Sequence, residues 1–445
     1  MDTIARLDRK YVWHPFTQEA TAPIPISVTH AKGIYVYDSQ GNAYKDMIAS
    51  WWVNLHGHSH PKLVKVLHQQ SSTLDHVAFA GFTHNPAVSL CERLSAILPD
   101  MLCKFFFSDN GSTSVEIALK MAYQYWHNKD KKRTRFIALE GGYHGDTLGA
   151  MSVGANSVYH NVFRELFFPV KFIPYPELLY GENELTIEEE EELVIKKLDS
   201  FLDKYGEETV ALIIEPCIQG ASGMRVCRTE FLNRIISRVR CYDIIVIFDE
   251  VLTGFGRTGP LFALEHLDEV PDIICLSKGI TGGMLPLGVT VATQRIYEAF
   301  LGTTTDTAFL HGHSYTANPI SCAVAIESFN LLTSKKCIEQ RKLIEEVHKA
   351  CIFDLYESKI GVYAPRILGT IGAFRLGKAR KQQQYQMSYG IECREKALQR
   401  GLIIRPLGNV VYFIPPYSIT AEELYDAYDT LQSVIQEMKI YQEKL

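Results

Sequence analysis

The sequence DIIVIFDEVLTGFGRTG at residues 243–259, followed by DIICLSKG at residues 272–279, decides the fold of this chain. Each stretch begins with a short apolar run, and each run ends at a charged residue: Asp249 in the first and Lys278 in the second. Continuous apolar runs of this length are typical of strands that are buried on both faces of a parallel sheet. Ligands bind beyond the carboxyl ends of such strands, so Asp249 and Lys278 are candidates for a common site.

The same pattern recurs between about residues 100 and 295, where apolar runs alternate with stretches of helical character. We therefore predict an α/β domain with a mostly parallel sheet of seven strands. The predicted strands are residues 104–108, 135–140, 170–174, 211–216, 244–248, 273–277 and 288–293.

Further elements flank this sheet on both sides. They are a strand-like segment at 34–38, a long helical pattern near 319–350, and short strands such as 410–414. We expect the two chain ends to pack together as a smaller α+β domain. The expected division of the chain is residues 1–55, 56–325 and 326–445.

Composition and charge narrow the class of function. A chain of 445 residues, 47% hydrophobic and 22% charged, is typical of a globular protein large enough for two domains. Its net charge of −6 argues against nucleic acid and anionic membranes as partners. The N-terminus lacks a secretory signal pattern, no apolar run reaches the roughly 18 residues that span a bilayer, and the cysteines form no C-x-x-C pair. We therefore expect a cytoplasmic protein that binds small molecules.

A turn between a strand and a helix supplies a third candidate feature. The strand-like KFFFSDN at 104–110 runs into Gly111 and Ser112, and apolar residues then recur at helical spacing, at Val115, Leu119, Ala122 and Trp126. The first amides of a helix have no acceptor within the helix, so this turn is a candidate anion site. The alternative is a simple helix cap.

Together the three features fit a pyridoxal phosphate site. Lys278 would form a Schiff base with the aldehyde of the cofactor. Asp249 would keep the pyridine nitrogen protonated, so that the ring accepts electrons, and residues 111–112 would bind the phosphate. A carboxylate on so buried a strand also needs a cationic partner.

Two other motifs have competing interpretations. Residues 254–259 match G-x-G-x-x-G, but the match lies in mid-chain, opens no helix and is followed by Pro260, which argues against a dinucleotide site. His56, His58 and His60 alternate in LHGHSHP. No carboxylate or cysteine stands near them and glycine and proline mark the run as a loop, so we expect no metal there.

The stretch FDEVLTGFGRTG at 248–259, with Lys278 downstream in LSKGITGG, resembles the signature of the class III (ω-amino-acid type) aminotransferases. The resemblance covers nearly the whole chain, through WHPFT (13–17), SWW (50–52), GFTHNPA (81–87), GGYHGDTLGAMSVG (141–154), HGHSYTANP (311–319) and RPLGNVVYFIPPY (405–417). It implies the type I pyridoxal-phosphate fold and a homodimer whose active sites lie at the subunit interface.

The resemblance also implies a role for each matching residue near the cofactor. Lys278 is the Schiff-base lysine, and Asp249 contacts the pyridine nitrogen. Tyr143 packs against one face of the ring and Val251 against the other, while Gly111 and Ser112 bind the phosphate.

A separate segment is implied to serve the neighbouring subunit. In HGHSYT, Gly312 would contribute to the substrate pocket, and His313 and Ser314 would contact the phosphate held by the other copy. Many members have Pro-Thr where this chain has His313 and Ser314. Because Ser314 still offers a hydroxyl, we expect function to survive this difference.

Within the family, the resemblance is to members that act in biotin biosynthesis on 7-keto-8-aminopelargonate. This substrate has a carboxylate at one end of an aliphatic chain and a ketone near the other end. Trp51 and Trp52 would line an apolar channel for it, and Arg405 would bind the carboxylate. The alternatives are another class III aminotransferase, acting on ornithine, 4-aminobutyrate or a polyamine, and a non-enzymatic binding protein that retains the fold.

Two amino donors stay open. Members that use S-adenosylmethionine generally carry tyrosine where this chain has Phe16, and some lysine-using relatives have phenylalanine there. Lysine-using relatives tend to lack the tryptophan at position 51, however, and an aromatic wall suits a sulfonium cation through cation–π attraction. With Tyr143 and Tyr412 both retained, we predict S-adenosylmethionine as the donor, with lysine as the alternative.

Overall fold

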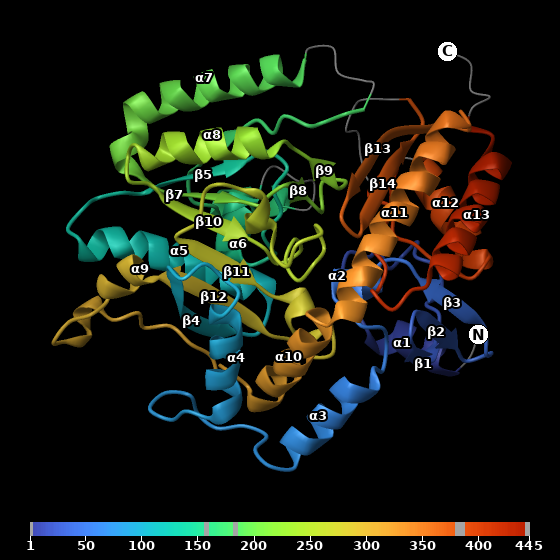
Figure 1. The fold of residues 1–445 in the computed structure, drawn as a ribbon, viewed down its shortest axis with the longest axis horizontal. Helices are drawn as coiled ribbons and strands as arrows, with labels where there is room; N and C mark the ends of the chain where they lie inside the picture. The colour runs from blue at the N-terminus through green and yellow to red at the C-terminus, as the bar shows by residue number, and fades with distance from the viewer. Residues whose placement is uncertain (1–2, 155–159, 181–185, 379–387, 441–445) are drawn as a thin grey trace.

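The centre of the molecule is a seven-stranded sheet with the strand order β4-β12-β11-β10-β7-β5-β6 (Figure 1). The strands are β4 (Leu102–Ser108), β5 (Arg135–Leu139), β6 (Val170–Ile173), β7 (Thr209–Ile214), β10 (Ile245–Asp249), β11 (Ile273–Leu276) and β12 (Gly288–Thr293). All neighbours pair in parallel except β12, which runs antiparallel to both β11 and β4. The seven strands predicted from the apolar runs are therefore confirmed. The computed structural model describes residues 3–154, 160–180, 186–378 and 388–440.

Helices cover both faces of this sheet. The main ones are α5 (Gly111–Asn128), α7 (Ile187–Tyr205) and α8 (Thr229–Arg240). Successive side chains of a strand point to opposite faces. In β10, Val246 and Phe248 accordingly join the apolar cluster that contains α7 and α8, whereas Ile245 and Ile247 join the cluster that contains α5. A strand that is apolar at every position is thus buried on both sides.

Local sequence explains how two of these helices begin. Thr186 and Glu189 form a reciprocal capping box at the start of α7, so the acidic run after Thr186 forms the first turn of a helix. At α5 the cap is Asn110, whose side chain accepts a hydrogen bond from the Thr113 amide at 2.9 Å. Because Asn110 caps the helix, the hydroxyl of Ser112 is not needed as a cap and can make other contacts.

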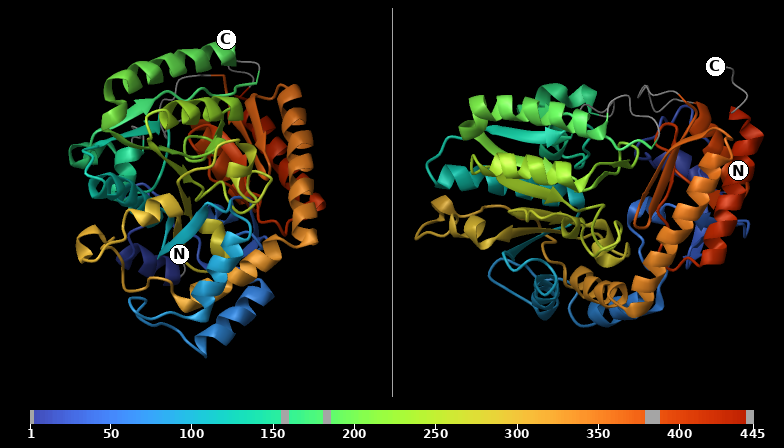
Figure 2. Two further views of the ribbon diagram at one scale, coloured as in Figure 1. Left: turned by 60° about the vertical axis from the view of Figure 1, so that its left-hand side comes forward. Right: turned by 45° about the horizontal axis from the view of Figure 1, so that its top comes forward.

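The two chain ends meet in a second lobe, as predicted. The N-terminal strands β1 (Val28–Lys32), β2 (Tyr35–Asp38) and β3 (Ala43–Asp46) form a sheet with β15 (Leu402–Ile403) from the C-terminal part. β3 and β15 pair in parallel, with Lys45 opposite Leu402 and Asp46 opposite Ile403. A second sheet holds β13 (Val362–Leu368), β14 (Ile371–Leu376) and β16 (Val410–Phe413), packed under α11 (Lys335–Glu357) and α13 (Ala421–Met438) (Figure 2).

The helical pattern predicted near 319–350 is two helices rather than one. α10 (Pro319–Leu332) ends before Thr333, and α11 begins after Ser334, whose side chain accepts a hydrogen bond from the Cys337 amide. The apolar spacing continues across residues 333–334, but Ser334 caps a new helix and so divides the pattern into two. α10 packs against α3 (Pro61–Ser71) and α4 (Asn85–Ser95), whereas α11 packs on the second lobe. The division of the chain at residue 325 stays a prediction.

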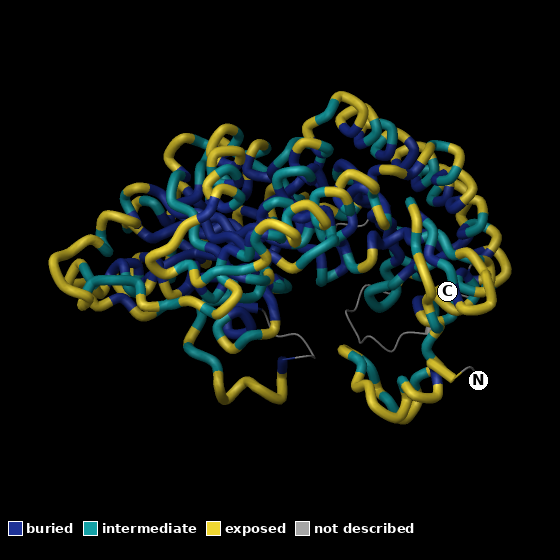
Figure 3. Tube along the Cα trace, turned by 90° about the horizontal axis from the view of Figure 1, so that it is seen from below, coloured by how far each residue is buried: buried dark blue, intermediate teal, exposed yellow. Residues whose placement is uncertain are grey.

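The smaller elements complete the chain. They are α1 (Thr3–Tyr11), α2 (Ala49–Trp52), α6 (Leu148–Val153), α9 (Gln294–Glu298), α12 (Ser388–Gln399), β8 (Ile218–Gln219) and β9 (Arg225–Val226). Buried backbone runs through the interior of both lobes, and exposed backbone follows their outer surfaces (Figure 3). Across the described residues, none of the helices combines the length and the apolar character that crossing a bilayer requires.

We predict that Gly57→Ala is more destabilising than Gly41→Ala. Both glycines have φ near +86°, which strains any other residue, but a Cβ at Gly57 would lie 2.5 Å from Ser418 Oγ and 3.1 Å from Gly33 Cα. A Cβ at Gly41 would have no heavy atom within 4 Å. Gly57→Ala should therefore lower the free energy of unfolding by about 2–4 kcal/mol and Gly41→Ala by about 1 kcal/mol. Denaturant unfolding of both variants measures the difference, and equal losses would show that Gly57 is not tightly packed.

Candidate active site

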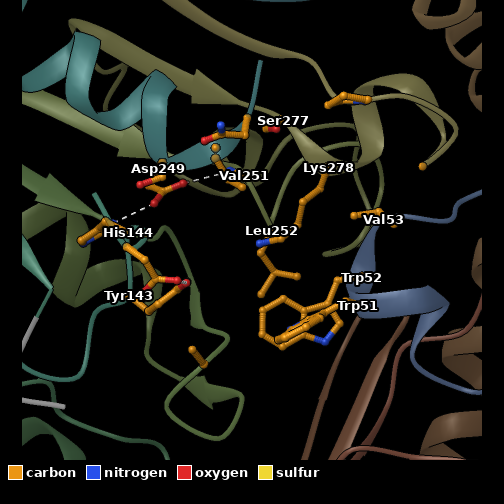
Figure 4. A pocket seen from close by; sticks show the side chains of 18 of the residues that line it. Trp51, Trp52, Val53, Tyr143, His144, Asp249, Val251, Leu252, Ser277 and Lys278 are labelled. Atoms are coloured by element: carbon orange, nitrogen blue, oxygen red, sulfur yellow. Dashed lines mark hydrogen bonds and ion pairs between the residues drawn. The ribbon is translucent and has the colours of Figure 1, made fainter. Parts of the chain in front are cut away.

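A cavity of about 730 Å³ opens at the carboxyl ends of β10 and β11, between the two lobes. Its lining brings together Asp249 and Lys278 from the large sheet, Trp52 from the N-terminal part and Arg405 from the C-terminal part. Figure 4 shows Tyr143, His144 and Asp249 on one side of the cavity, Lys278 on the other, and the two tryptophans below Lys278. Residues distant in the sequence thus share one site.

Lys278 is the second residue after β11 and has a φ of +44°, a left-handed conformation that costs energy for any residue with a Cβ. Its Nζ lies 4.9 Å from the centre of the Trp52 ring. Enclosure in the cavity lowers the pKa of this amine, and the nearby carboxylates of Asp249 and Glu215 oppose that effect in part. A lysine amine whose pKa is lowered is a better nucleophile at neutral pH.

Asp249 is the last residue of β10 and is buried. Its Oδ2 lies 2.7 Å from His144 Nδ1, and its Oδ1 accepts a hydrogen bond from the Val251 amide at 3.0 Å. The sequence predicts a cationic partner for this buried carboxylate. In the structure the side chain that pairs with it is the imidazole of His144 rather than a lysine or an arginine. Two fixed hydrogen bonds orient Asp249 toward the cavity that it lines.

The N-terminus of α5 forms another wall of the cavity. Gly111 and Ser112 are its first two residues, and both line the cavity. A Cβ at Gly111 would lie 2.6 Å from Val251 Cγ1, so the close approach of Val251 to the helix requires glycine. Ser112 Oγ lies 2.8 Å from Thr147 Oγ1 and accepts a hydrogen bond from the Thr147 amide at 3.0 Å. The amides of this first turn and the Ser112 hydroxyl can therefore bind an anion.

Aromatic side chains and one arginine form the opposite wall. The guanidinium carbon of Arg405 lies 3.9 Å from the centre of the Trp51 ring, and Phe16 meets that ring edge-on at 5.6 Å. Trp52 Nε1 donates a hydrogen bond to Tyr412 Oη at 3.1 Å. The wall is therefore apolar along the two tryptophans and carries a cation at one end.

Tyr143 and Glu215 complete the side of the cavity next to Asp249. Tyr143 Oη donates to Asp146 Oδ2 at 2.8 Å, which fixes the ring. The carboxylate of Glu215 accepts hydrogen bonds from the amides of Tyr143 and Gly220, at 3.0 and 3.1 Å. Burial raises the pKa of Glu215 to about 7.

The aminotransferase class-III family matches residues 16–435, and this match covers most of the chain. The chain belongs to the class-III aminotransferases. It is 46% identical over 428 residues to the adenosylmethionine-8-amino-7-oxononanoate aminotransferase of Synechococcus elongatus, a comparison that covers 96% of this chain and 99% of the relative.

Solved structures agree with this family assignment. The crystal structure of adenosylmethionine-8-amino-7-oxononanoate aminotransferase from Methanocaldococcus jannaschii is 34% identical, with a TM-score of 0.89 over 98% of both chains. An amine transaminase from an uncultivated Pseudomonas species, solved in its PLP-bound form, is 29% identical, with a TM-score of 0.88 over 96% of this chain and 98% of that one. The expected type I fold is therefore confirmed.

The class-III segment HGHSYT lies apart from this cavity in the same chain. Gly312 and Ser314 are exposed and His313 is half-buried, and none of the three is among the described residues that line the cavity. The other predicted site residues, by contrast, all line it: Phe16, Trp51, Trp52, Gly111, Ser112, Tyr143, Asp249, Val251, Lys278, Arg405 and Tyr412.

The G-x-G-x-x-G match and the three histidines of LHGHSHP make contacts within the protein. In the G-x-G-x-x-G match, Arg257 is buried and donates to the backbone oxygens of Pro415 and Trp52, at 2.9 and 3.3 Å. His56 Nε2 lies 3.0 Å from Ser328 Oγ, and His58 Nε2 lies 3.0 Å from Asp46 Oδ2. No carboxylate stands near these histidines in the sequence, but folding brings Asp46 from the end of β3 to His58. Within the described ranges, side chains of the metal-binding types form no group of three that could hold an ion.

His144 and Glu215 are two residues of the site that sequence reasoning missed. Glu215 follows the apolar run of β7 directly, just as Asp249 ends the run of β10. His144 lies in the loop that follows β5. Glu215 and the loop that contains His144 both follow the carboxyl ends of parallel strands, which is where ligands bind in such sheets. That position is the sequence signal that identifies them.

We predict that Glu215 makes the stability of this class-III aminotransferase fall as the pH rises from about 4.5 to about 7. The folded protein keeps the proton on Glu215 up to a pKa of about 7, whereas the unfolded chain releases it near 4.5. The contribution of Glu215 to the free energy of unfolding should thus decrease across this window by up to about 3 kcal/mol. Glu215→Gln should remove this contribution alone, since burial also raises the pKa of Glu250 to about 7 and that group still titrates in the variant.

Denaturant unfolding at pH 5 and pH 8 measures this contribution. The control is Glu189→Gln, because the Thr186 amide and hydroxyl lower the pKa of Glu189 and place its titration below the window. A wild-type protein and a Glu215→Gln variant with the same pH dependence would contradict the prediction.

Proposed function

We propose that this class-III aminotransferase binds pyridoxal phosphate and transfers an amino group to 7-keto-8-aminopelargonate (8-amino-7-oxononanoate), with S-adenosylmethionine as the donor. One observation carries the proposal. A single cavity contains Lys278, the Asp249–His144 pair and the N-terminus of α5, and it faces a wall of Trp51 and Arg405. The printed names of the relatives contain both adenosylmethionine and 8-amino-7-oxononanoate, which supports this choice of substrates.

The residues of the cavity fit pyridoxal phosphate group by group. Its aldehyde needs a nucleophilic amine, and enclosure lowers the pKa of Lys278. Its pyridine nitrogen needs a carboxylate, and Asp249 is buried and held by His144. Its phosphate needs amide donors, which Gly111 and Ser112 supply at the start of α5. When bound, the cofactor supplies an electron sink that stabilises negative charge on the carbon bearing the transferred nitrogen.

The protein's own groups move and hold the protons of the reaction. Nζ of Lys278 accepts the proton that the amino donor loses from the carbon bearing its nitrogen. In the second half-reaction nitrogen replaces the ketone oxygen of the keto substrate, the oxygen leaves as water, and Nζ of Lys278 then delivers a proton to that same carbon. Asp249, held by His144, would keep a proton on the pyridine nitrogen. Tyr143 and Val251 line the same cavity and would pack against the ring.

The aromatic wall suits the two proposed substrates. Trp51 and Trp52 provide an apolar surface for the aliphatic chain of the keto acid, and Arg405 provides a cation for its carboxylate. The same rings suit a sulfonium cation. Phe16 lies against Trp51 at the place where a tyrosine would add one hydroxyl.

We further propose that two copies of the chain share their active sites in the cytoplasm. Gly312, His313 and Ser314 would then serve the partner, with His313 and Ser314 at its phosphate. Leu310 and Tyr315, which flank these residues, have 76% and 65% of their surface exposed, as expected for apolar side chains that a second copy covers. All ten cysteines are free thiols, which agrees with a reducing compartment.

We predict that Lys278→Ala abolishes both covalent attachment of the cofactor and turnover, because Lys278 supplies the amine of the site. Borohydride reduction fixes the cofactor to the lysine that holds it, and peptide mapping of the wild-type protein should find it at position 278. Lys104→Ala is the control, since Lys104 lies over the Tyr297 ring and should leave labelling and activity intact. Labelling of a different lysine in the wild-type protein would refute the assignment.

We predict that S-adenosylmethionine, more than lysine, converts the enzyme in a single half-reaction without keto substrate. Phe16→Tyr should raise the rate with S-adenosylmethionine about five-fold, because a restored hydrogen bond contributes about 1 kcal/mol. Loss of the cofactor's visible absorbance measures the rate with each donor. Phe82→Tyr adds a hydroxyl at an exposed phenylalanine and serves as the control. Conversion by lysine alone would refute the donor and leave the transaminase proposal standing.

A further inference from the structure

The α2 segment is one turn of left-handed helix. Ala49, Ser50, Trp51 and Trp52 have φ values of +46°, +46°, +74° and +74°. In this conformation the Cβ of each residue crowds the following carbonyl oxygen, so consecutive residues other than glycine do not adopt it without support. The surroundings of α2 must therefore hold it in place.

This turn carries both tryptophans of the active-site wall. Trp51 packs against Arg405, and Trp52 donates a hydrogen bond to Tyr412 and lies over Lys278. A backbone of the ordinary hand between Ile48 and Val53 would point the two side chains in other directions. The left-handed turn thus decides where the two rings stand in the cavity.

One buried carboxylate joins the turn to its surroundings. Asp46 Oδ2 accepts a hydrogen bond from Ser50 Oγ at 2.7 Å and lies 3.0 Å from His58 Nε2. Asp46 Oδ1 accepts from the Ile48 amide at 3.2 Å. We call Asp46, Ser50 and His58 the Asp46 clamp. It contacts the start and the middle of the turn, and its members are not among the described residues that line the cavity.

Asp46 and His58 of the Asp46 clamp are both held by backbone hydrogen bonds. Asp46 ends β3, where its amide donates to the Ile34 oxygen at 2.8 Å and its backbone pairs with Ile403. The His58 amide donates to the Gly33 oxygen at 2.7 Å, and the Gly33 amide donates back to the His58 oxygen at 3.1 Å. The clamp therefore transmits the rigidity of the N-terminal sheet to the turn.

We propose that Asp46, Ser50 and His58 are positioning residues that hold α2 in its left-handed turn and thereby set Trp51 and Trp52 against the substrates. This inference rests on the proposed function for the identity of those substrates. His58, from the LHGHSHP motif, thereby has a role outside the cofactor site.

The first test follows the turn itself, by hydrogen exchange and mass spectrometry of the holoenzyme. The amides of Trp52 and Val53 donate to the oxygens of Ile48 and Ala49 within the turn, at 2.7 and 3.0 Å. Asp46→Asn should speed their exchange about 10-fold or more, because the turn opens more often. His58→Gln should do the same to a smaller extent, and it covers the case in which Asp46→Asn does not fold.

Asp38→Asn is the matched control for this measurement. Asp38 is a buried aspartate of the same sheet, and its Oδ1 accepts from the amides of Gln40 and Asn42. It should leave the exchange of residues 52–53 unchanged. Unaltered exchange at these amides in both Asp46→Asn and His58→Gln would overturn the proposal, whatever the substrates of the enzyme are.

A second test separates relief of backbone strain from loss of one hydrogen bond. Ser50→Ala and Ser50→Gly both remove the hydroxyl that donates a hydrogen bond to Asp46. Glycine, unlike alanine, adopts a φ of +46° without strain. Adding Asp46→Asn should speed exchange less in the Ser50→Gly protein than in the Ser50→Ala protein. Equal effects in the two backgrounds would overturn the claim that the clamp holds a strained turn.

A third test concerns catalysis with 7-keto-8-aminopelargonate and S-adenosylmethionine. Asp46→Asn should raise the KM of one or both about 10-fold, with kcat changed by less than about three-fold, because misplaced tryptophans weaken substrate binding. The absorbance of the bound cofactor should stay as in the wild-type protein, since Asp249, His144 and α5 are untouched. A loss confined to kcat or to cofactor absorbance would overturn the positioning role. Absence of turnover in the wild-type protein would refute the proposed function and leave the exchange tests valid.

Discussion

The parallel pairing of β10 with β11 is the constraint on which the active site depends. The two strands run in register, with Asp249 opposite Cys275, so the aspartate and the lysine that follows β11 emerge at the same edge of the sheet. Both strands are apolar and buried on both faces. Polar groups can therefore leave these strands only at their ends, and the chemistry of the protein collects there.

The second lobe completes the site because it closes over that edge. The pairing of β3 with β15 joins the two chain ends, and the same region carries Trp51, Trp52 and Arg405 into the cavity. The large sheet thus supplies the groups proposed to hold the cofactor, and the second lobe supplies those proposed to hold the substrates. Specificity can therefore vary through the chain ends while the cofactor site stays constant.

The left-handed turn at α2 shows how the two lobes depend on each other. Asp46 of the N-terminal sheet accepts a hydrogen bond from Ser50 in this strained turn. Trp52, the last residue of the turn, contacts Tyr412 from β16 and Lys278, which follows β11 of the large sheet. Gly57 lets the following segment pass close to Gly33 and Ser418, which places His58 beside Asp46. Local strain is thus accepted where it fixes side chains in the cavity.

The sequence by itself determined the large sheet and the cofactor-site candidates at its strand ends. Strands buried on both faces are apolar at every position, and the polar residue that ends such a run, Asp249 or Lys278, can be read directly. The tertiary structure decided the partners of those residues and the shape of the substrate wall. His144 reaches Asp249 and Arg405 reaches Trp51 across long stretches of chain, and Asp46 reaches His58 across a loop of the N-terminal part. No periodicity encodes these contacts, because they depend on how the two lobes pack and on a backbone conformation at Ala49–Trp52 that local propensity disfavours.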